Sequence, residues 1–125
     1  MINWERVIMS IQRYEVGARM SQAVVHNDTV YLAGQVAQNT PGGSITDQTK
    51  DICAAIDKLL AQCGSDKSKL LAATIWLNTM DDFAEMNAVW DAWVVPGQTP
   101  CRAGVESARL AASGFNVEIM VIAAV

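Results

Sequence analysis

The sequence is poor in the residues that most often bind metals or form disulfide frameworks. It has three cysteines and one histidine, and Cys53, Cys63 and Cys101 show no CxxC spacing. A structural zinc site needs about four closely spaced Cys or His ligands, so no metal site is expected. Cys53 and Cys63 fall on the apolar side of a helical pattern, where a free thiol acts as a small hydrophobe. His26 is expected at a strand end, partly exposed, which disfavours a Cys–His catalytic pair.

Long apolar runs and clustered cations are missing as well. No uninterrupted apolar segment approaches the roughly 18–20 residues that span a bilayer. Glu5, Arg6 and Arg13 interrupt the N-terminal segment, which therefore lacks the apolar region of a signal peptide. These features predict a cytoplasmic protein with no membrane partner. The net charge is −4 and the nine Lys and Arg residues are scattered, whereas nucleic-acid binding needs clustered cations, so no nucleic-acid partner is expected.

What the chain does contain is enough apolar sequence for one core. Hydrophobic residues make up 51% of its 125 residues, a length typical of one domain. No repeat, low-complexity tract or long linker divides the sequence. We therefore predict a single domain over residues 1–125, with residues 1–8 as a candidate N-terminal extension.

The spacing of apolar residues predicts an α+β fold with the order βββαβαββ. Strands are expected at 11–16, 23–26, 29–33, 71–77, 103–108 and 117–124, with a tight turn at Asn27-Asp28 because both residues tolerate positive φ. One helix should start at Thr46 or Asp47 and stop near Gly64. A second should start near Asp82, with Glu85 as its capping-box partner, and end at 96–97. The strands at 29–33 and 71–77 should pair in parallel across the first helix.

Two of the predicted strands are mostly apolar on both faces. In the strand at 117–124, one side carries Val117, Ile119, Val121 and Ala123. In the strand at 71–77, one side carries Leu71, Ala73, Ile75 and Leu77. Two helices, each about 10 Å across, cover only one face of such a sheet. The second face is expected to pack against another copy of the chain.

Three polar residues are candidates for a functional site. Glu118 is the one charge in the strand at 117–124, where a carboxylate is costly unless it is paired or wetted by a cleft. Arg102 precedes the small residues Ala103 and Gly104, which leave room for a ligand, and its guanidinium can bind a carboxylate through two hydrogen bonds. Asn87 lies within the second helix although Asn is a weak helix former, which indicates a hydrogen-bonding role. Each residue also has an ordinary structural interpretation, and their spacing alone names no reaction.

Taken together, the segments at 30–35 (VYLAGQ), 82–87 (DFAEMN), 99–102 (TPCR) and 117–119 (VEI) resemble the Rid family, also called the YjgF or L-PSP endoribonuclease family. The resemblance covers about residues 18–125 and points to its YoaB-like branch. It implies a chorismate-mutase-like fold, in which two helices lie on one face of a mixed sheet. It also implies a homotrimer around a central barrel, with active sites between subunits. The implied activity is cofactor-free hydrolysis of reactive 2-imino or enamino acids to 2-keto acids and ammonia.

The resemblance also assigns roles to residues of this chain. Arg102 would hold the carboxylate of the small-molecule substrate, and Glu118 would position or activate the attacking water. Asn87 could line the cleft, and the backbone near Gly34 and Gly104 would complete it.

The chain departs from well-studied family members at three cleft positions. Met20 stands in place of a Tyr, Ala33 in place of a Ser, and Gly104 in place of a Cys, so the cleft is expected to be roomier and less polar in places. Two other functions are compatible with the same features. One is a non-catalytic trimeric module that binds small carboxylates. The other, a ribonuclease or translation inhibitor, is disfavoured by the acidic balance.

Overall fold

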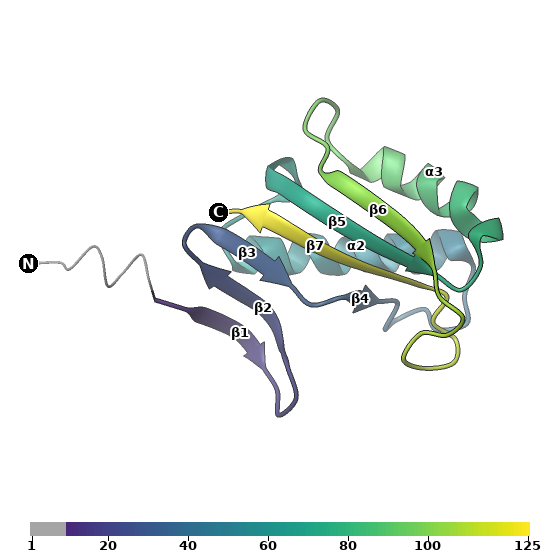
Figure 1. Cartoon of the computed structure of the whole chain (residues 1–125), viewed down its shortest axis with the longest axis horizontal. Helices are drawn as coiled ribbons and strands as arrows, with labels where there is room; N and C mark the ends of the chain where they lie inside the picture. The colour runs from purple at the N-terminus through teal and green to yellow at the C-terminus, as the bar shows by residue number, and fades with distance from the viewer. Residues whose placement is uncertain (1–9) are drawn as a thin grey trace, which may run out of the picture.

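The computed structural model describes residues 10–125 (Figure 1). Its strands are β1 (Gln12–Val16), β2 (Ser21–His26), β3 (Thr29–Leu32), β4 (Gln35–Val36), β5 (Leu70–Leu77), β6 (Cys101–Glu106) and β7 (Val117–Ala124). Its helices are α2 (Ile45–Gln62) and α3 (Phe83–Trp93), accompanied by the 3-10 turns η1 (Lys67–Lys69) and η2 (Met80–Asp82). Within these residues no helix is long and apolar enough to cross a membrane. The predicted domain and its extension at 1–8 include residues outside this range and stay predictions.

The strands form one mixed sheet in which β7 is central. Their order is β1-β2-β3-β7-β5-β6, and β4 also pairs with β7. β7 runs antiparallel to both β3 and β5, so the prediction that the strands flanking α2 pair with each other is wrong. The physical reason is that β7, apolar on both sides, takes the central position where both of its edges are paired. The parallel pair is instead β5 and β6, which α3 connects.

The hairpin between β2 and β3 forms as expected. Asn27 and Asp28 have φ values of 49° and 62°, the left-handed conformation that a tight two-residue hairpin turn requires. His26 pairs with Thr29 at the turn and is half-buried, as predicted.

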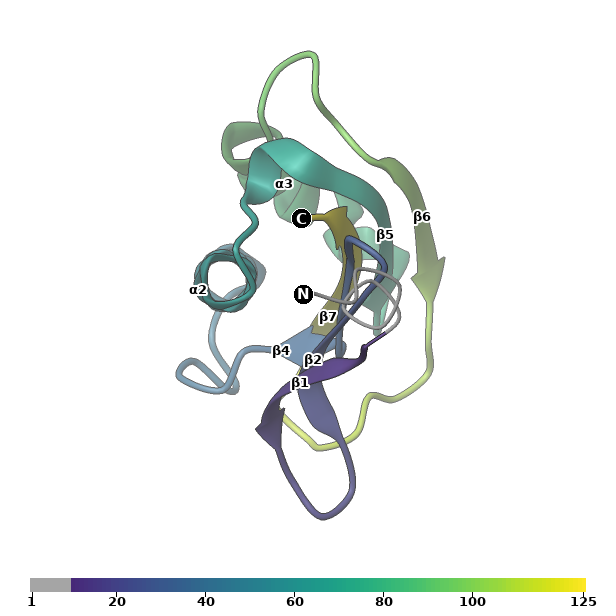
Figure 2. The same cartoon turned by 90° about the vertical axis from the view of Figure 1, so that its left-hand side faces the viewer.

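Both helices cover the same face of the sheet (Figure 2), which confirms the expected fold, although the predicted order βββαβαββ lacks the short strand β4 before α2. In α2 the residues spaced by a helical turn, Ile52, Ile56 and Leu60, are fully buried. They belong to the same core as Ile119 and Val121 of β7, which are also fully buried. The helical spacing of apolar residues therefore decides which side of α2 faces the sheet.

Both helix starts differ from the prediction: α2 begins at Ile45, one residue before the expected Thr46 or Asp47, and α3 lacks its expected cap. In α2, Ser44 is the N-cap, and its Oγ accepts from the amide of Asp47 at 3.0 Å. In α3, Asp82 makes no side-chain capping bond, so the capping box with Glu85 is wrong. The reason is that the η2 turn leads directly into α3, while Glu85 Oε1 instead accepts from Thr46 Oγ1 at 2.9 Å. That bond links the start of α3 to the first turn of α2.

The second face of the sheet remains open in a single chain. Tyr31 on β3 and Val105 on β6 are 45% and 42% exposed. On β5 the alternation is broken at one position, because an irregularity between Leu70 and Ala72 turns Leu71 outward. Leu71 is 49% exposed while Leu70 is buried, so the prediction that Leu71 shares a side with Ala73, Ile75 and Leu77 is wrong. An apolar surface of this kind is typical of a contact with another protein chain.

Candidate active site

Arg102 lies on the edge strand β6, on the side of the sheet that the helices cover. Its strand partner on β5 is Ala73, which is buried under the helices. Although the arginine is exposed, its guanidinium is held by contacts with α3. Nη1 donates to Oδ1 of Asn87 at 2.7 Å, and Cζ lies 5.4 Å from the ring centre of Trp90 and 5.6 Å from that of Phe83. The structure thus brings the predicted residues Arg102 and Asn87 together.

Gly104 is on the same side of β6, two residues beyond Arg102. A Cβ at Gly104 would lie 3.1 Å from Cε1 of Phe83, so the space beside this glycine is filled by an aromatic ring of the same chain. Gly104 therefore permits the close packing of Phe83 rather than opening room for a ligand on that side. Because Phe83 also contacts Arg102, Gly104 belongs to the surroundings of the arginine.

Glu118 lies on the opposite side of the sheet. Its neighbours along β7, Val117 and Ile119, point into the core and are fully buried, so the alternation of the strand turns Glu118 to the open face. The carboxylate is half-buried, and within residues 10–125 no cation or hydrogen-bond donor pairs with it. Burial raises the pKa of Glu118 above its ordinary value of 4.5, because the charged form loses hydration.

Gly34 gives the Glu118 carboxylate the space that it occupies. A Cβ at Gly34 would collide with Oε2 of Glu118 and lie 3.0 Å from its Cδ. The loop that carries Gly34 is fixed by the buried Gln35, whose Nε2 donates to the carbonyl of Ala33 and to Oε1 of Gln22, both at 3.0 Å. A buried amide with its hydrogen bonds satisfied holds such a loop in one place.

A cleft of about 630 Å³ surrounds the carboxylate. It contains the predicted residues Met20, Gly34 and Glu118, and the side chain of Met20 is 47% exposed. Residues that the sequence did not single out also line it: Glu15, Gln22, Gln35, Val36, Gln38, Ala55, Lys58, Leu59 and Ala111. They come from β1, β2, β4, α2 and two loops, and polar residues such as Lys58 and Gln38 leave no local pattern that marks them as cleft residues.

The six predicted residues thus form two groups in one chain. Arg102, Asn87 and Gly104 lie beside α3 on the helix side, whereas Met20 and Gly34 lie with Glu118. Because β5 separates β6 from β7, and the two charged side chains point to opposite faces, one chain alone does not bring Arg102 to Glu118.

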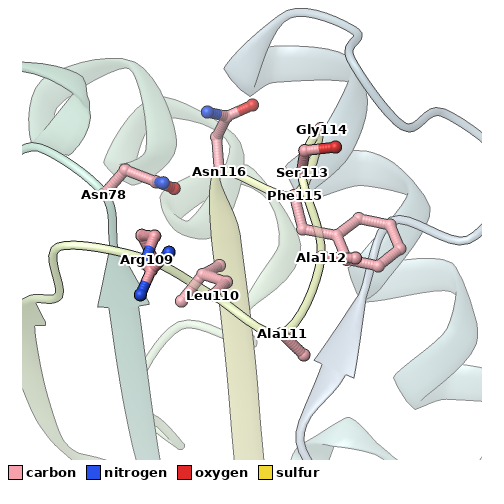
Figure 3. Close-up of a pocket in the computed structure, with 9 residues that line it drawn as sticks. All are labelled: Asn78, Arg109, Leu110, Ala111, Ala112, Ser113, Gly114, Phe115 and Asn116. Atoms are coloured by element: carbon pink, nitrogen blue, oxygen red, sulfur yellow. The ribbon is translucent and has the colours of Figure 1, made fainter.

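Another hollow lies beside the loop between β6 and β7. Figure 3 shows it, with Asn78, Arg109 and Asn116 around it; its volume is about 760 Å³. None of the six predicted site residues lines it, but Ala111 borders both this hollow and the Glu118 cleft. Among the residues that the structure describes, no group of three or more His, Cys, Asp or Glu is arranged to hold a metal ion.

Comparison with known proteins identifies the family. The family described as Endoribonuclease L-PSP matches residues 10–125. The chain belongs to this family, the Rid or YjgF family. It is 44% identical over 117 residues to the RutC family protein YoaB of Escherichia coli K12, covering 94% of this chain and all of that protein. The crystal structure of a YjgF family member from Neisseria meningitidis is 46% identical, covers 94% of this chain and 96% of that one, and superposes with a TM-score of 0.89.

A more distant relative of this Rid chain has an activity in its name. The 2-iminobutanoate/2-iminopropanoate deaminase of mouse is 32% identical over 109 residues, which cover 82% of this chain and 78% of the mouse protein. The family and the likeness to YoaB agree with the resemblance drawn from the sequence segments at 30–35, 82–87, 99–102 and 117–119.

Proposed function

We propose that this protein is an imine/enamine deaminase, which hydrolyses reactive 2-imino or 2-enamino acids to 2-keto acids and ammonia. The observation that carries the proposal is the pair of incomplete charged sites: a positioned guanidinium at Arg102, and an unpaired carboxylate at Glu118 in a cleft. A 2-imino acid fits both groups, since its carboxylate can bind the Arg102 guanidinium and its electrophilic carbon, next to that carboxylate, can react with a water that Glu118 activates. The mouse relative, named for this reaction, supports the assignment. We place the activity in the cytoplasm and expect it to need no cofactor.

The complete site lies between two copies of the chain in this proposal. The apolar open face, with Tyr31 and Val105 exposed, is the surface that would be covered in a homotrimer. In that assembly Arg102 of one copy faces Glu118 of its neighbour, which removes the separation that exists within one chain. The cleft around Glu118 then becomes closed by a second subunit, as an active site between subunits requires.

The chemistry follows from the two charges. The guanidinium of Arg102 donates two parallel N–H···O bonds to the substrate carboxylate and so fixes the imine carbon in place. Glu118 takes a proton from water as the water oxygen bonds to that carbon, and the C=N electron pair moves onto nitrogen, which takes the proton back from Glu118 to give the carbinolamine. The carbinolamine hydroxyl then gives its proton to Glu118, which passes it to nitrogen, so that the carbonyl forms as the C–N bond breaks and ammonia leaves. A pKa raised by burial makes Glu118 a better base than an exposed glutamate.

The direct test is the release of ammonia and 2-keto acid from freshly generated 2-iminopropanoate and 2-iminobutanoate. Wild-type protein should hydrolyse both faster than buffer does. Arg102→Ala and Glu118→Gln should each lower kcat/KM by about 10²-fold or more, because they remove substrate anchoring and proton transfer. Lys69→Ala, which removes one charge from the exposed η1 turn, is the matched control and should leave the rate unchanged.

Glu118→Gln also separates catalysis from plain binding of small carboxylates. It should still bind a 2-keto acid such as pyruvate, while Arg102→Ala should not. A wild-type protein that binds pyruvate through Arg102 but does not accelerate imine hydrolysis would replace the deaminase with a binding module.

A further inference from the structure

The side chain of Arg102 is more restrained than its exposure suggests. An exposed arginine ordinarily samples many rotamers, because its long side chain carries considerable conformational entropy. Here one N–H donates to Asn87, and the cation lies close to the rings of Phe83 and Trp90. These contacts use only part of the guanidinium, which has five N–H donors, so other donors remain for a ligand.

All three contacts come from a single stripe of α3. Phe83, Asn87 and Trp90 are spaced i, i+4 and i+7, which places them on one side of the helix. Trp90 is also part of the core, being only 4% exposed. The guanidinium therefore rests on a surface that is itself fixed by the packing of α3 against α2 and the sheet.

Gly104 determines how closely Phe83 can approach β6. A Cβ at this position would be 3.1 Å from Cε1 of Phe83, a separation that forces the ring to shift. The glycine thus keeps Phe83 next to the strand that carries Arg102, two residues away. Strand, ring and cation form one packed unit, so a change at Gly104 reaches the arginine through Phe83.

We infer that Phe83, seated by Gly104, is a positioning residue that pre-orients Arg102 for a carboxylate ligand, a role resting on the proposed function. Phe83 does not touch substrate; it limits the rotamers of the arginine by stacking. Binding by an arginine that is already ordered loses less entropy than binding by a mobile one. The aromatic face at residue 83 therefore sets how tightly the site holds the carboxylate, while proton transfer at Glu118 is unaffected.

The test compares Phe83→Leu, Phe83→Tyr and Gly104→Ala with Phe115→Leu. Phe115 is the other of the chain's two phenylalanines and lies in the β6–β7 loop, so its loss controls for a general effect of removing an aromatic ring. Phe83→Leu should raise KM for 2-iminopropanoate, and Kd for pyruvate, about three- to tenfold with kcat within about twofold. Gly104→Ala should move both constants in the same direction. Phe83→Tyr, which keeps the aromatic face, should restore wild-type values, as should the Phe115→Leu control.

A second measurement does not depend on turnover. The Nε–H order parameter of Arg102, from side-chain NMR relaxation, should be high in the wild type and fall in Phe83→Leu, but not in Phe115→Leu. An unchanged order parameter with unchanged KM and Kd in Phe83→Leu would overturn the inference. If Arg102→Ala still abolished turnover while Phe83→Leu changed nothing, the deaminase function would stand and only the positioning role of Phe83 would be rejected. The order parameter of Arg102 could also fall in Phe83→Leu while the wild-type protein hydrolyses no imine. That result would support the positioning role of Phe83 and reject the deaminase function.

Discussion

The two charged residues of the candidate site are in opposite situations. Arg102 is exposed, yet its guanidinium is held by Asn87, Phe83 and Trp90. Glu118 is half-buried, yet no group within residues 10–125 pairs with it. Exposure alone is therefore a poor guide to which side chain is ready to act. The Arg102 cation is pre-oriented, whereas the Glu118 carboxylate has lost hydration without gaining a partner. This is the arrangement expected of two halves of an active site that a ligand or a second subunit completes.

The largest effect should come from changing the surface that would bring the two halves together. Tyr31→Asp places a charge on the open face, where the tyrosine is 45% exposed in one chain. The single chain should tolerate it, but a charge buried without a partner at a subunit contact should weaken assembly by about 10²-fold or more and abolish hydrolysis with it. Light scattering after gel filtration measures the mass. Ala61→Asp, on the exposed side of α2, is the control; an active monomer of Tyr31→Asp would show that the two halves need no second copy.

A smaller effect is expected inside the Glu118 half alone. Gly34→Ala introduces a Cβ that collides with the carboxylate, so Glu118 must rotate away from its position. Because the obstacle is the end of a flexible side chain, the melting temperature should change by only a few degrees, while kcat should fall about tenfold through misplacement of the base. Thermal unfolding and steady-state kinetics measure both. A wild-type kcat in Gly34→Ala would mean that the present position of Glu118 is not the catalytic one.

The smallest effect is a displacement of the pH profile. Glu118 acts as a base only when ionised, and burial raises its pKa; activity should therefore be lost as pH falls through a value above 4.5, the ordinary pKa of this side chain. The acid limb of kcat/KM against pH reports this value in the free enzyme. Arg102→Lys, which keeps a cation, should lower the rate but leave the limb in place. A limb below pH 4.5 would show that a nearby cation, such as Arg102 of the neighbouring copy, lowers the pKa of Glu118 by more than burial raises it.

The elements of this fold were predictable because they depend on local patterns. Helical spacing located α2 and α3, alternation located β7, and Asn27-Asp28 located the hairpin. The position of β7 between β3 and β5 was not predictable, since strand order depends on which surfaces fit together rather than on local spacing. The outward turn of Leu71 was missed for a related reason: a one-residue irregularity reverses the faces without leaving a mark in the residue types.

The site was only partly readable from sequence. Glu118 stood out as a charge in an apolar strand, and that signal led to a residue in a cleft. The contact of Arg102 with Asn87 was not predictable, although the i, i+4, i+7 spacing of Phe83, Asn87 and Trp90 places all three on one side of α3. Arg102 and Glu118 face opposite sides of the sheet. Predicting this would need the register of β5 with both β6 and β7, and no single sequence segment contains that information.

In the proposed enzyme, Arg102 and Glu118 act from different copies of the chain. Mixing Arg102→Ala with Glu118→Gln in equal amounts, by unfolding and refolding them together, tests it most directly. Each variant alone should be inactive, but random trimers contain sites in which the intact arginine of one copy meets the intact glutamate of another. Such sites are about one in four for equal mixing in a symmetric ring, so the mixture should recover about a quarter of the wild-type activity. A refolded mixture no more active than the separate variants would contradict the claim.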